Sequence, residues 1–257
     1  MTIRVGILGA GGRMGRMLTQ VVRERADRFD LVGLVEHSAS PHLETESDFT
    51  SDLAAVCQAA DVVIDFTLPT ATDGNLAAAQ AGNCAVVLGT TGLTAEQEAN
   101  LESAAKHIPV LYAANYSLGV NLLLELTRQA AKGVPEFDIE IVEMHHGQKV
   151  DAPSGTALAL GKAAAAGRDW DFDAVARLSR EGHTGAREKE EIGFATLRGG
   201  DVAGDHSVIL AGARETITLQ HYAGDRIIFA QGAVSAAGWL AGKAPGLYGM
   251  RDVLGFA

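Results

Sequence analysis

Short apolar segments alternate with helix-like segments through the first half of the chain. The apolar segments show no regular alternation with polar residues, which is typical of parallel strands buried on both faces. They occupy residues 3–8, 31–35, 62–66, 85–88 and 110–113. Helices are predicted between them over residues 13–25, 72–81 and 95–106. Thr94 and Gln97 have the spacing of a capping box at the start of the last helix. Strand and helix in this order predict an α/β protein with a doubly wound parallel sheet.

The pattern changes after Ser117. A long predicted helix over 120–132 leads to a segment, 137–144, in which apolar and polar residues largely alternate. Strand-like segments and a final apolar helix follow at 192–197, 207–210, 215–220 and 227–242. Alternation indicates a sheet with one face toward solvent or an interface, unlike the fully buried strands of the first half. We therefore place a domain boundary near residue 117.

The composition is that of a globular protein and narrows the possible partners. The 32 acidic residues outnumber the 21 lysines and arginines, so the formal net charge is −11. This excess of negative charge argues against nucleic acid and against an anionic membrane as partners. The apolar helix over 227–242 is shorter than the about 20 residues that a membrane span needs, and the first residues lack the pattern of a signal peptide. With only two cysteines in the chain, we expect a soluble, cytoplasmic protein.

A glycine-rich turn joins the first strand to the first helix. Residues 9–15 read Gly-Ala-Gly-Gly-Arg-Met-Gly, and such a turn lets backbone amides approach a pyrophosphate at a helix start. Its glycine spacing differs from the usual dinucleotide fingerprint, because Met14 stands at the sixth position. Glu36 ends the second strand about 20 residues later, where an acid binds the ribose hydroxyls in such folds. The pattern predicts dinucleotide binding, and the alternatives are a structural turn and a solvated carboxylate.

The greatest concentration of reactive side chains lies between residues 143 and 156. The sequence there is Glu-Met-His-His-Gly-Gln-Lys-Val-Asp-Ala-Pro-Ser-Gly-Thr. Ser154 has the character of a helix N-cap, so the amides of Gly155 and Thr156 would point from a helix start toward a carboxylate. The two histidines and the lysine indicate acid–base chemistry or anion binding. The alternatives are histidines that merely pack and a metal site. We predict no metal, because His145 and His146, as neighbours on a strand, would face opposite sides.

The chain resembles the dihydrodipicolinate reductase family, also called 4-hydroxy-tetrahydrodipicolinate reductases, of the bacterial diaminopimelate route to lysine. The matching segments appear in family order over nearly the whole length, and 143–156 is the most specific. They are residues 9–16, 65–67, 89–92, 113–121, 143–156, 192–200 and 244–250. The resemblance implies a Rossmann-type domain made of residues 1–117 and 227–257. It also implies a central α+β domain with a mixed sheet, residues 118–226, through which a homotetramer forms.

The resemblance further implies the reaction and its residues. A family member uses NADH or NADPH to reduce a small cyclic imine with two carboxylates, 4-hydroxy-tetrahydrodipicolinate, to tetrahydrodipicolinate with loss of water. His145 would be the proton donor and acceptor, and Lys149 a second proton donor. The substrate would also contact His146, Gly155 and Thr156. The cofactor would contact Gly9, Ala10, Gly11, Gly12, Arg13 and Met14 at the pyrophosphate, Glu36 and His37 at the ribose, and Gly89, Thr90, Thr91, Ala113, Ala114, Asn115 and Tyr116 at the nicotinamide half.

Three positions depart from the commoner family pattern. Tyr116 stands where phenylalanine is frequent and would add a hydroxyl to an aromatic wall, whereas His37 and Leu68 stand where arginine is often found near the adenosine 2′-phosphate. Glu36 would repel that phosphate. A histidine with an ordinary pKa of about 6.5 is largely neutral at pH 7 and offsets the repulsion only weakly. We therefore predict that NADH is preferred and that NADPH is still accepted.

An acidic protein that binds a dicarboxylate needs a local positive pocket. We expect Lys149, one or both histidines, Arg198 and the helix start at Ser154 to supply it. Two rival functions remain: another small-substrate dehydrogenase, and a redox sensor that binds NADH. Acyl-forming dehydrogenases need a reactive cysteine, and the two cysteines lie away from the histidines and lysine in sequence. A sensor needs a partner-binding module, and no segment is basic enough for a recognition helix.

Overall fold

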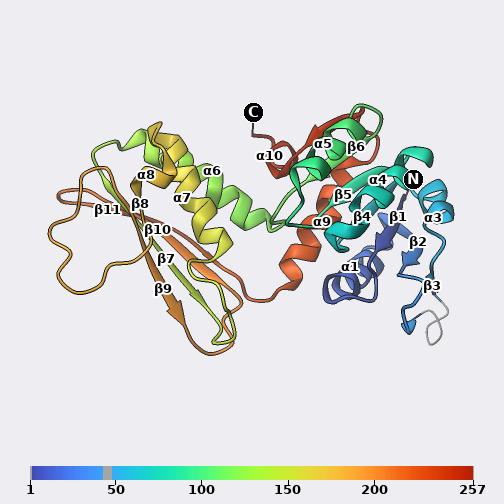
Figure 1. Ribbon diagram of the computed structural model, residues 1–257, viewed down its shortest axis with the longest axis horizontal. Coiled ribbons are helices and arrows are strands. Elements are labelled where there is room, and N and C mark those ends of the chain that lie inside the picture. Colours follow the sequence, from blue (N-terminus) through green and yellow to red (C-terminus); the bar gives the residue numbers. More distant parts are fainter. Residues whose placement is uncertain (1, 43–47, 257) are drawn as a thin grey trace. The chain divides into compact units, whose positions relative to one another are not determined.

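The computed structural model describes residues 2–42 and 48–256, which form two compact units (Figure 1). Residues 1–118 together with 227–257 make the first unit, and residues 119–226 make the second. No helix in the described part of the chain is long and apolar enough to cross a membrane.

Among the described residues, the first unit is built on a seven-stranded parallel sheet. In spatial order its strands are β12 (Gly246–Tyr248), β6 (Pro109–Tyr112), β5 (Ala85–Leu88), β4 (Val62–Asp65), β1 (Ile3–Leu8), β2 (Phe29–Val35) and β3 (Phe49–Thr50). Its helices are α1 (Arg13–Glu24), α3 (Leu53–Ala59), η1 (Pro69–Ala71), α4 (Thr72–Ala81), α5 (Ala95–Ala104), α9 (Ile227–Leu240) and α10 (Met250–Val253).

The strands of this sheet are apolar on both sides because helices cover both faces. Val5 and Ile7 of β1 belong to one core cluster with side chains of α1 and α9. Leu8 of β1 and Val63 of β4 belong to a second cluster with side chains of α3, α4 and α5. Successive strand residues point to opposite faces, so a strand buried on both sides cannot alternate apolar with polar residues. The predicted doubly wound parallel sheet is confirmed.

The second unit, described throughout, contains a five-stranded mixed sheet. Its strands are β11 (Thr216–Tyr222), β10 (Asp205–Ala211), β7 (Asp138–His145), β9 (Ile192–Arg198) and β8 (Ala176–Arg177), in that spatial order. β10 is antiparallel to β7 and β11, while β9 is parallel to β7 and β8. Its helices are α6 (Leu118–Gly133), α7 (Gly155–Arg168) and α8 (Phe172–Val175). Ile139 and Ile141 of β7 share a core cluster with Leu160 and Ala164 of α7. The predicted α+β arrangement with a mixed sheet is confirmed.

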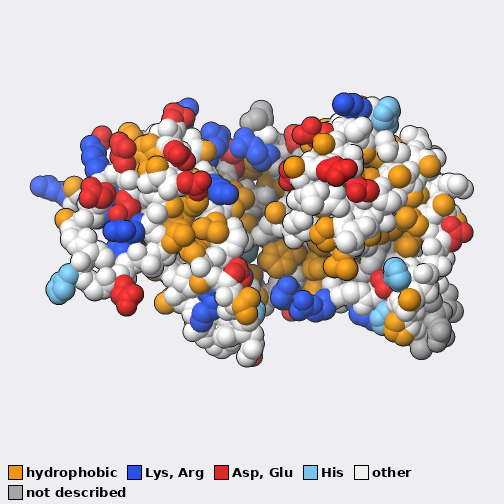
Figure 2. Space-filling view, in the orientation of Figure 1, with side chains coloured by type: hydrophobic (Ala, Val, Ile, Leu, Met, Phe, Trp, Pro, Cys, Tyr) orange, Lys and Arg blue, Asp and Glu red, His pale blue; other side chains and the backbone are white. Residues whose placement is uncertain are grey.

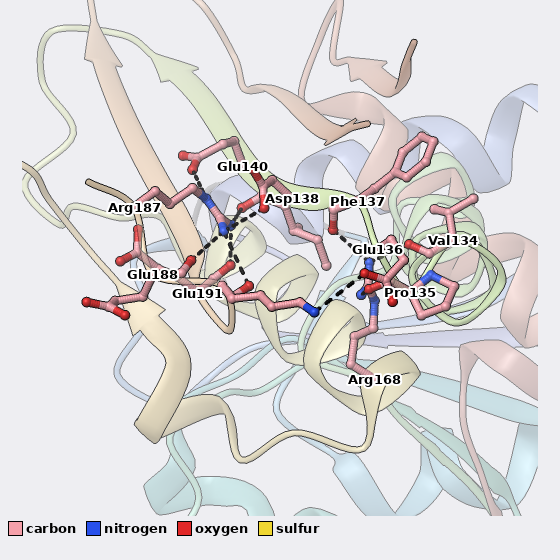
Figure 3. A network of polar contacts seen from close by, with 12 residues as sticks. Val134, Pro135, Glu136, Phe137, Asp138, Glu140, Arg168, Arg187, Glu188 and Glu191 are labelled. Atoms are coloured by element: carbon pink, nitrogen blue, oxygen red, sulfur yellow. Dashed lines mark hydrogen bonds and ion pairs between the residues drawn. The ribbon is translucent and has the colours of Figure 1, made fainter. Parts of the chain in front are cut away.

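The segment between β8 and β9 is held to β7 by arginine–carboxylate pairs (Figure 3). Arg187 Nη1 lies 2.9 Å from Asp138 Oδ1, and its Nε lies 3.2 Å from Glu140 Oε1. Arg180 donates to both oxygens of Glu140, at 2.9 and 2.7 Å, and also to Glu191. Burial would raise the pKa of Glu140, but the hydrogen bonds from Arg180 and Arg187 outweigh it and lower the pKa. Acidic and basic side chains are accordingly interspersed on the face of this unit in Figure 2.

The predicted elements differ from the structure mainly at their ends. β2 begins at Phe29 rather than at residue 31, because the Phe29 ring is buried in the core. The predicted helices over 95–106 and 227–242 each end two residues early. The short strands β3, β8 and β12 and the four-residue helices α8 and α10 were missed, since so few residues carry little periodicity. The capping box is confirmed: the Gln97 amide donates to Thr94 Oγ1 at 3.3 Å, and the Thr94 amide donates to Gln97 Oε1 at 3.0 Å.

One glycine of α9 permits the close approach of another segment. A Cβ on Gly232 would lie 1.7 Å from the carbonyl oxygen of Tyr116, whereas a Cβ on Gly74 of α4 would meet nothing within 4 Å. We expect Gly232→Ala to lower the free energy of unfolding by about 1–3 kcal/mol or more through overpacking. Gly74→Ala should raise it by up to about 1 kcal/mol, because alanine favours the helix. Urea unfolding followed by circular dichroism measures both, and a neutral Gly232→Ala would contradict the packing described.

Candidate functional site

In the first unit, the carboxyl ends of β1, β2 and β4 border a pocket of about 620 Å³. The glycine turn contributes Gly9 and Gly12 to its lining, the end of β2 contributes Glu36 and His37, and the segment after β4 contributes Leu68. Ligands of doubly wound sheets bind at this edge. The structure therefore brings the glycine turn and the predicted ribose-binding acid together at one pocket.

The backbone of the turn fits a bound dinucleotide. Gly9 has φ +75°, a left-handed conformation that glycine adopts readily. Its carbonyl accepts a hydrogen bond from the Gly12 amide at 3.1 Å, and a Cβ on Gly15 would lie 2.3 Å from the same oxygen. α1 begins with Arg13 and Met14 directly after Gly12, so the positive end of this helix lies at the pocket. Glycine at position 15 therefore permits close packing of α1 on the turn, whereas Gly9 and Gly12 add no side chain to the pocket that they line.

Sequence reasoning missed two residues beside the turn. Arg16 of α1 donates from Nε to the Gly11 carbonyl at 3.2 Å, and its Nη2 lies 3.2 Å from Nδ1 of His42. A Cβ on Gly11 would lie 2.3 Å from Cδ2 of His42 and 3.3 Å from the carboxyl carbon of Glu36. A guanidinium and an imidazole therefore lie near the ribose-binding acid. The place of Arg16 in the first turns of α1 could have suggested it, whereas no motif marks His42.

A buried carboxylate network supports the floor of this pocket. Asp65, at the end of β4, accepts hydrogen bonds from the Thr67 amide at 2.8 Å, the Thr67 hydroxyl at 2.7 Å and Asn75 Nδ2 at 2.8 Å. The Thr90 hydroxyl donates to the Thr67 carbonyl at 3.1 Å. Burial raises the pKa of Asp65 despite these hydrogen bonds. The network ties the segment after β4 to the segment after β5.

The residues expected at the nicotinamide half follow two adjacent strands. They are Gly89, Thr90 and Thr91 after β5, and Ala113, Ala114, Asn115 and Tyr116 after β6. Tyr116 is only 2% exposed, and its hydroxyl lies 2.7 Å from the Leu88 carbonyl and 3.2 Å from the Leu111 carbonyl. The expectation that Tyr116 adds a hydroxyl to a ligand-facing wall is therefore wrong. The hydroxyl bonds to backbone in the core, and burial raises its pKa well above the usual value.

In the second unit, the end of β7 carries a buried glutamate–histidine pair. His145 Nδ1 lies 2.5 Å from Glu143 Oε2. Glu143 is 1% exposed and also accepts hydrogen bonds from Arg198 Nη1 and Nη2, at 2.8 and 3.0 Å, and from the Ser154 amide at 3.0 Å. Burial would raise the pKa of Glu143, but the hydrogen bonds from Arg198, His145 and Ser154 outweigh it and lower the pKa. The carboxylate is therefore ionised near neutral pH.

The start of α7 lies against the same pair. Ser154 Oγ accepts from the Ala157 amide at 3.1 Å, which confirms Ser154 as the N-cap. Gly155 and Thr156 are then the first two residues of α7. His206 of β10 places Nε2 3.0 Å from Ser154 Oγ. Burial and the neighbouring His145 lower the pKa of His206 to about 4, so this ring is neutral at pH 7.

The two cations expected to form a positive pocket are both paired. Lys149 Nζ donates to Asp151 at 2.7 and 2.9 Å, and Arg198 holds Glu143 and the Asp151 carbonyl. Arg198 was expected to contribute to a local positive pocket, but in the structure its charge is balanced by Glu143. His146 follows the end of β7 and donates its amide to the Val202 carbonyl at 2.8 Å. The expectation that it occupies the strand beside His145 is wrong.

Sequence reasoning did not assign a role to Glu143 or notice His206. In the antiparallel register of β7 and β10, Glu143 lies directly opposite His206, and His206 lies opposite His221 of β11. Glu143 stands two positions before His145, so their side chains share one face of β7. The spacing of two residues between Glu143 and His145 could have indicated that Glu143 contacts His145. No local sequence pattern indicates the strand register that places His206 opposite Glu143.

The fold and these two sets of residues define a Rossmann-type oxidoreductase that uses a nicotinamide dinucleotide. The chain belongs to the dihydrodipicolinate reductase family. The family model for the N-terminus matches residues 3–116, and the model for the C-terminus matches residues 119–254. The resemblance found in the sequence is confirmed, and the protein is an NAD(P)H-dependent oxidoreductase.

Relatives match over the full length. The 4-hydroxy-tetrahydrodipicolinate reductase of Alkalilimnicola ehrlichii is 49% identical, over 99% of this chain and all of the relative. That of Pseudomonas fluorescens is 46% identical, over 98% of each chain. The solved structure of dipicolinate-bound dihydrodipicolinate reductase from Paenisporosarcina sp. TG-14 superposes with a TM-score of 0.80 at 26% identity, covering 98% of this chain and 99% of that one.

Proposed function

We propose that the protein reduces 4-hydroxy-tetrahydrodipicolinate to tetrahydrodipicolinate with NAD(P)H and loss of water, in the diaminopimelate route of lysine biosynthesis. The observation that carries this proposal is the Glu143–His145 pair beside the start of α7, in a chain about half identical to relatives of that name. His145 can exchange protons with a substrate, and the neighbouring start of α7 can bind a substrate carboxylate.

The substrate carboxylates would be held by the start of α7 and by Lys149. The amides of Gly155 and Thr156 would bind one carboxylate, and the helix dipole would add to the attraction. Lys149 is paired with the exposed side chain of Asp151. Surface ion pairs are weak, so a substrate carboxylate can replace Asp151 as the partner of Lys149. His146 would make a further substrate contact.

The proton would be exchanged by His145, with Lys149 as a second donor. Glu143 holds Nδ1 of His145, which leaves Nε2 as the nitrogen that faces the substrate. An imidazole can both give and accept a proton, as general acid–base catalysis requires. The ring hydroxyl can leave as water only if its oxygen receives a proton. After hydride transfer, the reduced ring must also receive a proton.

The first unit would hold the cofactor, which supplies a hydride when bound. Residues 9–14 would contact the pyrophosphate, and Glu36 with His37 would contact the adenosine ribose. Residues 89–91 and 113–116 would flank the nicotinamide half, with Tyr116 contributing backbone rather than its buried ring. The hydrogen bonds among Asp65, Thr67 and Thr90 would keep these segments in place.

A direct assay tests the proposal. Purified protein is mixed with NADH, the cyclic imine is added, and the loss of reduced nicotinamide absorbance is followed while the product is identified by mass spectrometry. We expect oxidation of NADH together with formation of tetrahydrodipicolinate. NADH binding without oxidation would favour the sensor. Turnover with a hydroxy acid or an aldehyde but not with the imine would favour another dehydrogenase.

We also propose that NADH is preferred over NADPH by about 1 kcal/mol, or about fivefold in kcat/KM at pH 8. Glu36 and His37 line the pocket, and Leu68 supplies no charge there. A carboxylate repels the 2′-phosphate, whereas an arginine would pair with it. His37→Arg should therefore shift the preference toward NADPH.

The control for this preference is Arg16→Gln. Arg16 contacts the Gly11 carbonyl and His42, and Gly11 lies beside the Glu36 carboxylate, so Arg16 is a second cation near the ribose site. If Arg16 does not reach the phosphate, Arg16→Gln leaves the NADH to NADPH ratio unchanged. A clear NADPH preference of the unmodified protein at pH 8 would contradict the role given to Glu36 and His37. Loss of that preference in Arg16→Gln would then identify the responsible cation.

Finally, we propose that the protein forms a homotetramer through the second unit. Light scattering after size-exclusion chromatography measures the oligomeric state.

We also propose that the protein is located in the cytoplasm. Both thiols are compatible with a reducing compartment, because burial raises the pKa of Cys57 to about 11 and that of Cys84 to about 12. Such thiols are protonated and inert at neutral pH, which also disfavours an acyl-forming dehydrogenase.

A further inference from the structure

We infer that Glu143 is a positioning residue that aligns the proton-exchanging ring of His145 and the carboxylate-binding start of α7 on a single buried carboxylate. This inference rests on the proposed function and deepens it, because it explains how His145 and the start of α7 keep a fixed relation through Glu143, which lies 11 residues before Ser154. None of the expected catalytic or binding residues supplies this link by itself.

The first contact fixes the tautomer of His145. An ionised carboxylate only accepts hydrogen bonds, so the proton of the neutral ring must lie on Nδ1, 2.5 Å from Glu143 Oε2. The lone pair is then on Nε2. Gly204, with φ +151°, leaves space beside that nitrogen, since a Cβ there would lie 2.9 Å from Nε2. The ring edge packs against His206 at 5.1 Å between centroids, which limits its rotation.

The second contact fixes the start of α7. The Ser154 amide donates to Glu143 Oε1 at 3.0 Å, and the Ser154 hydroxyl accepts from the Ala157 amide. Ser154 Oγ also lies 3.0 Å from His206 Nε2. Ser154 is therefore held on both its amide and its hydroxyl. Displacement of the Glu143 carboxylate would move the first residues of α7 and the His145 ring together.

Arg198 balances the charge of this buried carboxylate. Its two terminal nitrogens bind the two oxygens of Glu143, at 2.8 and 3.0 Å, in a bidentate pair. Removing the carboxylate would leave Arg198 beside His145 and disfavour a protonated ring, whereas removing Arg198 would favour it. The two changes should therefore act in opposite directions. Among the titratable and charged groups, Glu143 on β7 binds the His145 ring and His206 on β10 packs against it. Further out, Arg198 on β9 binds Glu143, His221 on β11 lies opposite His206, and Lys149 and Asp151 pair in the segment before α7.

The test compares Glu143→Gln with Arg198→Gln. Glu143→Gln should lower kcat by about 10²-fold and move the high-pH limb of the rate profile to lower pH by about one unit or more. Arg198→Gln should move that limb to higher pH. The matched control is Glu140→Gln, because Glu140 is also on β7 and also paired with arginines, and none of its contacts in the described part of the chain is with a histidine. The control should leave kcat and the pH profile unchanged, and all three variants should bind NADH like the unmodified protein.

Nitrogen-15 NMR of the histidine-labelled protein without ligands gives the readout that does not depend on turnover. We expect the Nδ1–H tautomer of His145 in the unmodified protein and in Glu143→Asp, and the Nε2–H tautomer in Glu143→Gln. An unchanged tautomer in Glu143→Gln, or limbs that move in the same direction in both variants, would overturn the inference. If Glu143→Gln does not fold, Arg198→Gln still decides it, because a high-pH limb that does not move to higher pH in that variant would overturn the inference. Failure of the unmodified protein to reduce the imine would instead contradict the proposed function.

Discussion

Replacing His145 with alanine should lower kcat by about 10²- to 10⁴-fold, the usual effect of losing a general acid or base. The ring lies at the end of β7 with Nδ1 bound to Glu143, so the variant removes the group proposed to exchange protons with the substrate. NADH affinity should stay nearly unchanged, because the glycine turn and Glu36 belong to the other unit. Steady-state kinetics and a fluorescence titration with NADH measure the two effects separately.

A second histidine provides the control for this variant. His183 belongs to the same unit, in the exposed segment between β8 and β9. His183→Ala should have the kcat of the unmodified protein. Near-normal turnover in His145→Ala would exclude the proposed role of His145, and an equal loss in both variants would point to damage of the unit rather than to lost chemistry.

Lys149→Ala should reduce kcat/KM by about 10²-fold or more, with little change in NADH affinity. The ammonium group is proposed to bind a substrate carboxylate and to serve as a second proton donor. Its loss should therefore raise KM and lower kcat. A methyl group offers neither a charge nor a hydrogen-bond donor at this position. The comparison requires saturating NADH and a range of imine concentrations, so that KM and kcat are resolved.

The partner of this lysine supplies the matched control. Asp151 binds Lys149 Nζ through both oxygens, and the hydrogen bond from Lys149 lowers the pKa of Asp151. Asp151→Asn weakens the pair without removing the ammonium group, so kcat should change little and KM should fall slightly. A loss in Asp151→Asn as large as in Lys149→Ala would mean that the ion pair itself, rather than a free lysine, is what the reaction requires.

The fold was predictable where the pattern of residues is local and periodic. Apolar strands without alternation, such as residues 85–88, can be stable only between two helical layers, and the structure has this arrangement. The Ser154 cap and the Thr94 capping box were equally predictable, because each depends on residues within one turn of a helix.

The candidate site was less predictable because its contacts depend on tertiary register. His206 reaches Ser154 only because β10 pairs with β7 in one particular register. The pairing of Arg198 with Glu143 likewise depends on β9 lying beside β7, so a cation that looks available in the sequence is committed in the structure. Tyr116 shows the same limit, since the burial of its hydroxyl depends on a hydrogen bond to the Leu88 carbonyl, 28 residues away.

The most direct test of the central claim is transfer of the isotope from NADH deuterated at the reactive nicotinamide carbon to the substrate ring. Purified protein, the deuterated cofactor and 4-hydroxy-tetrahydrodipicolinate are combined, and the product is analysed by mass spectrometry. The proposed function requires tetrahydrodipicolinate that carries a single deuterium, formed in step with oxidation of the cofactor. Cofactor oxidation that leaves the product unlabelled, or no conversion of the imine while NADH remains bound, would contradict it.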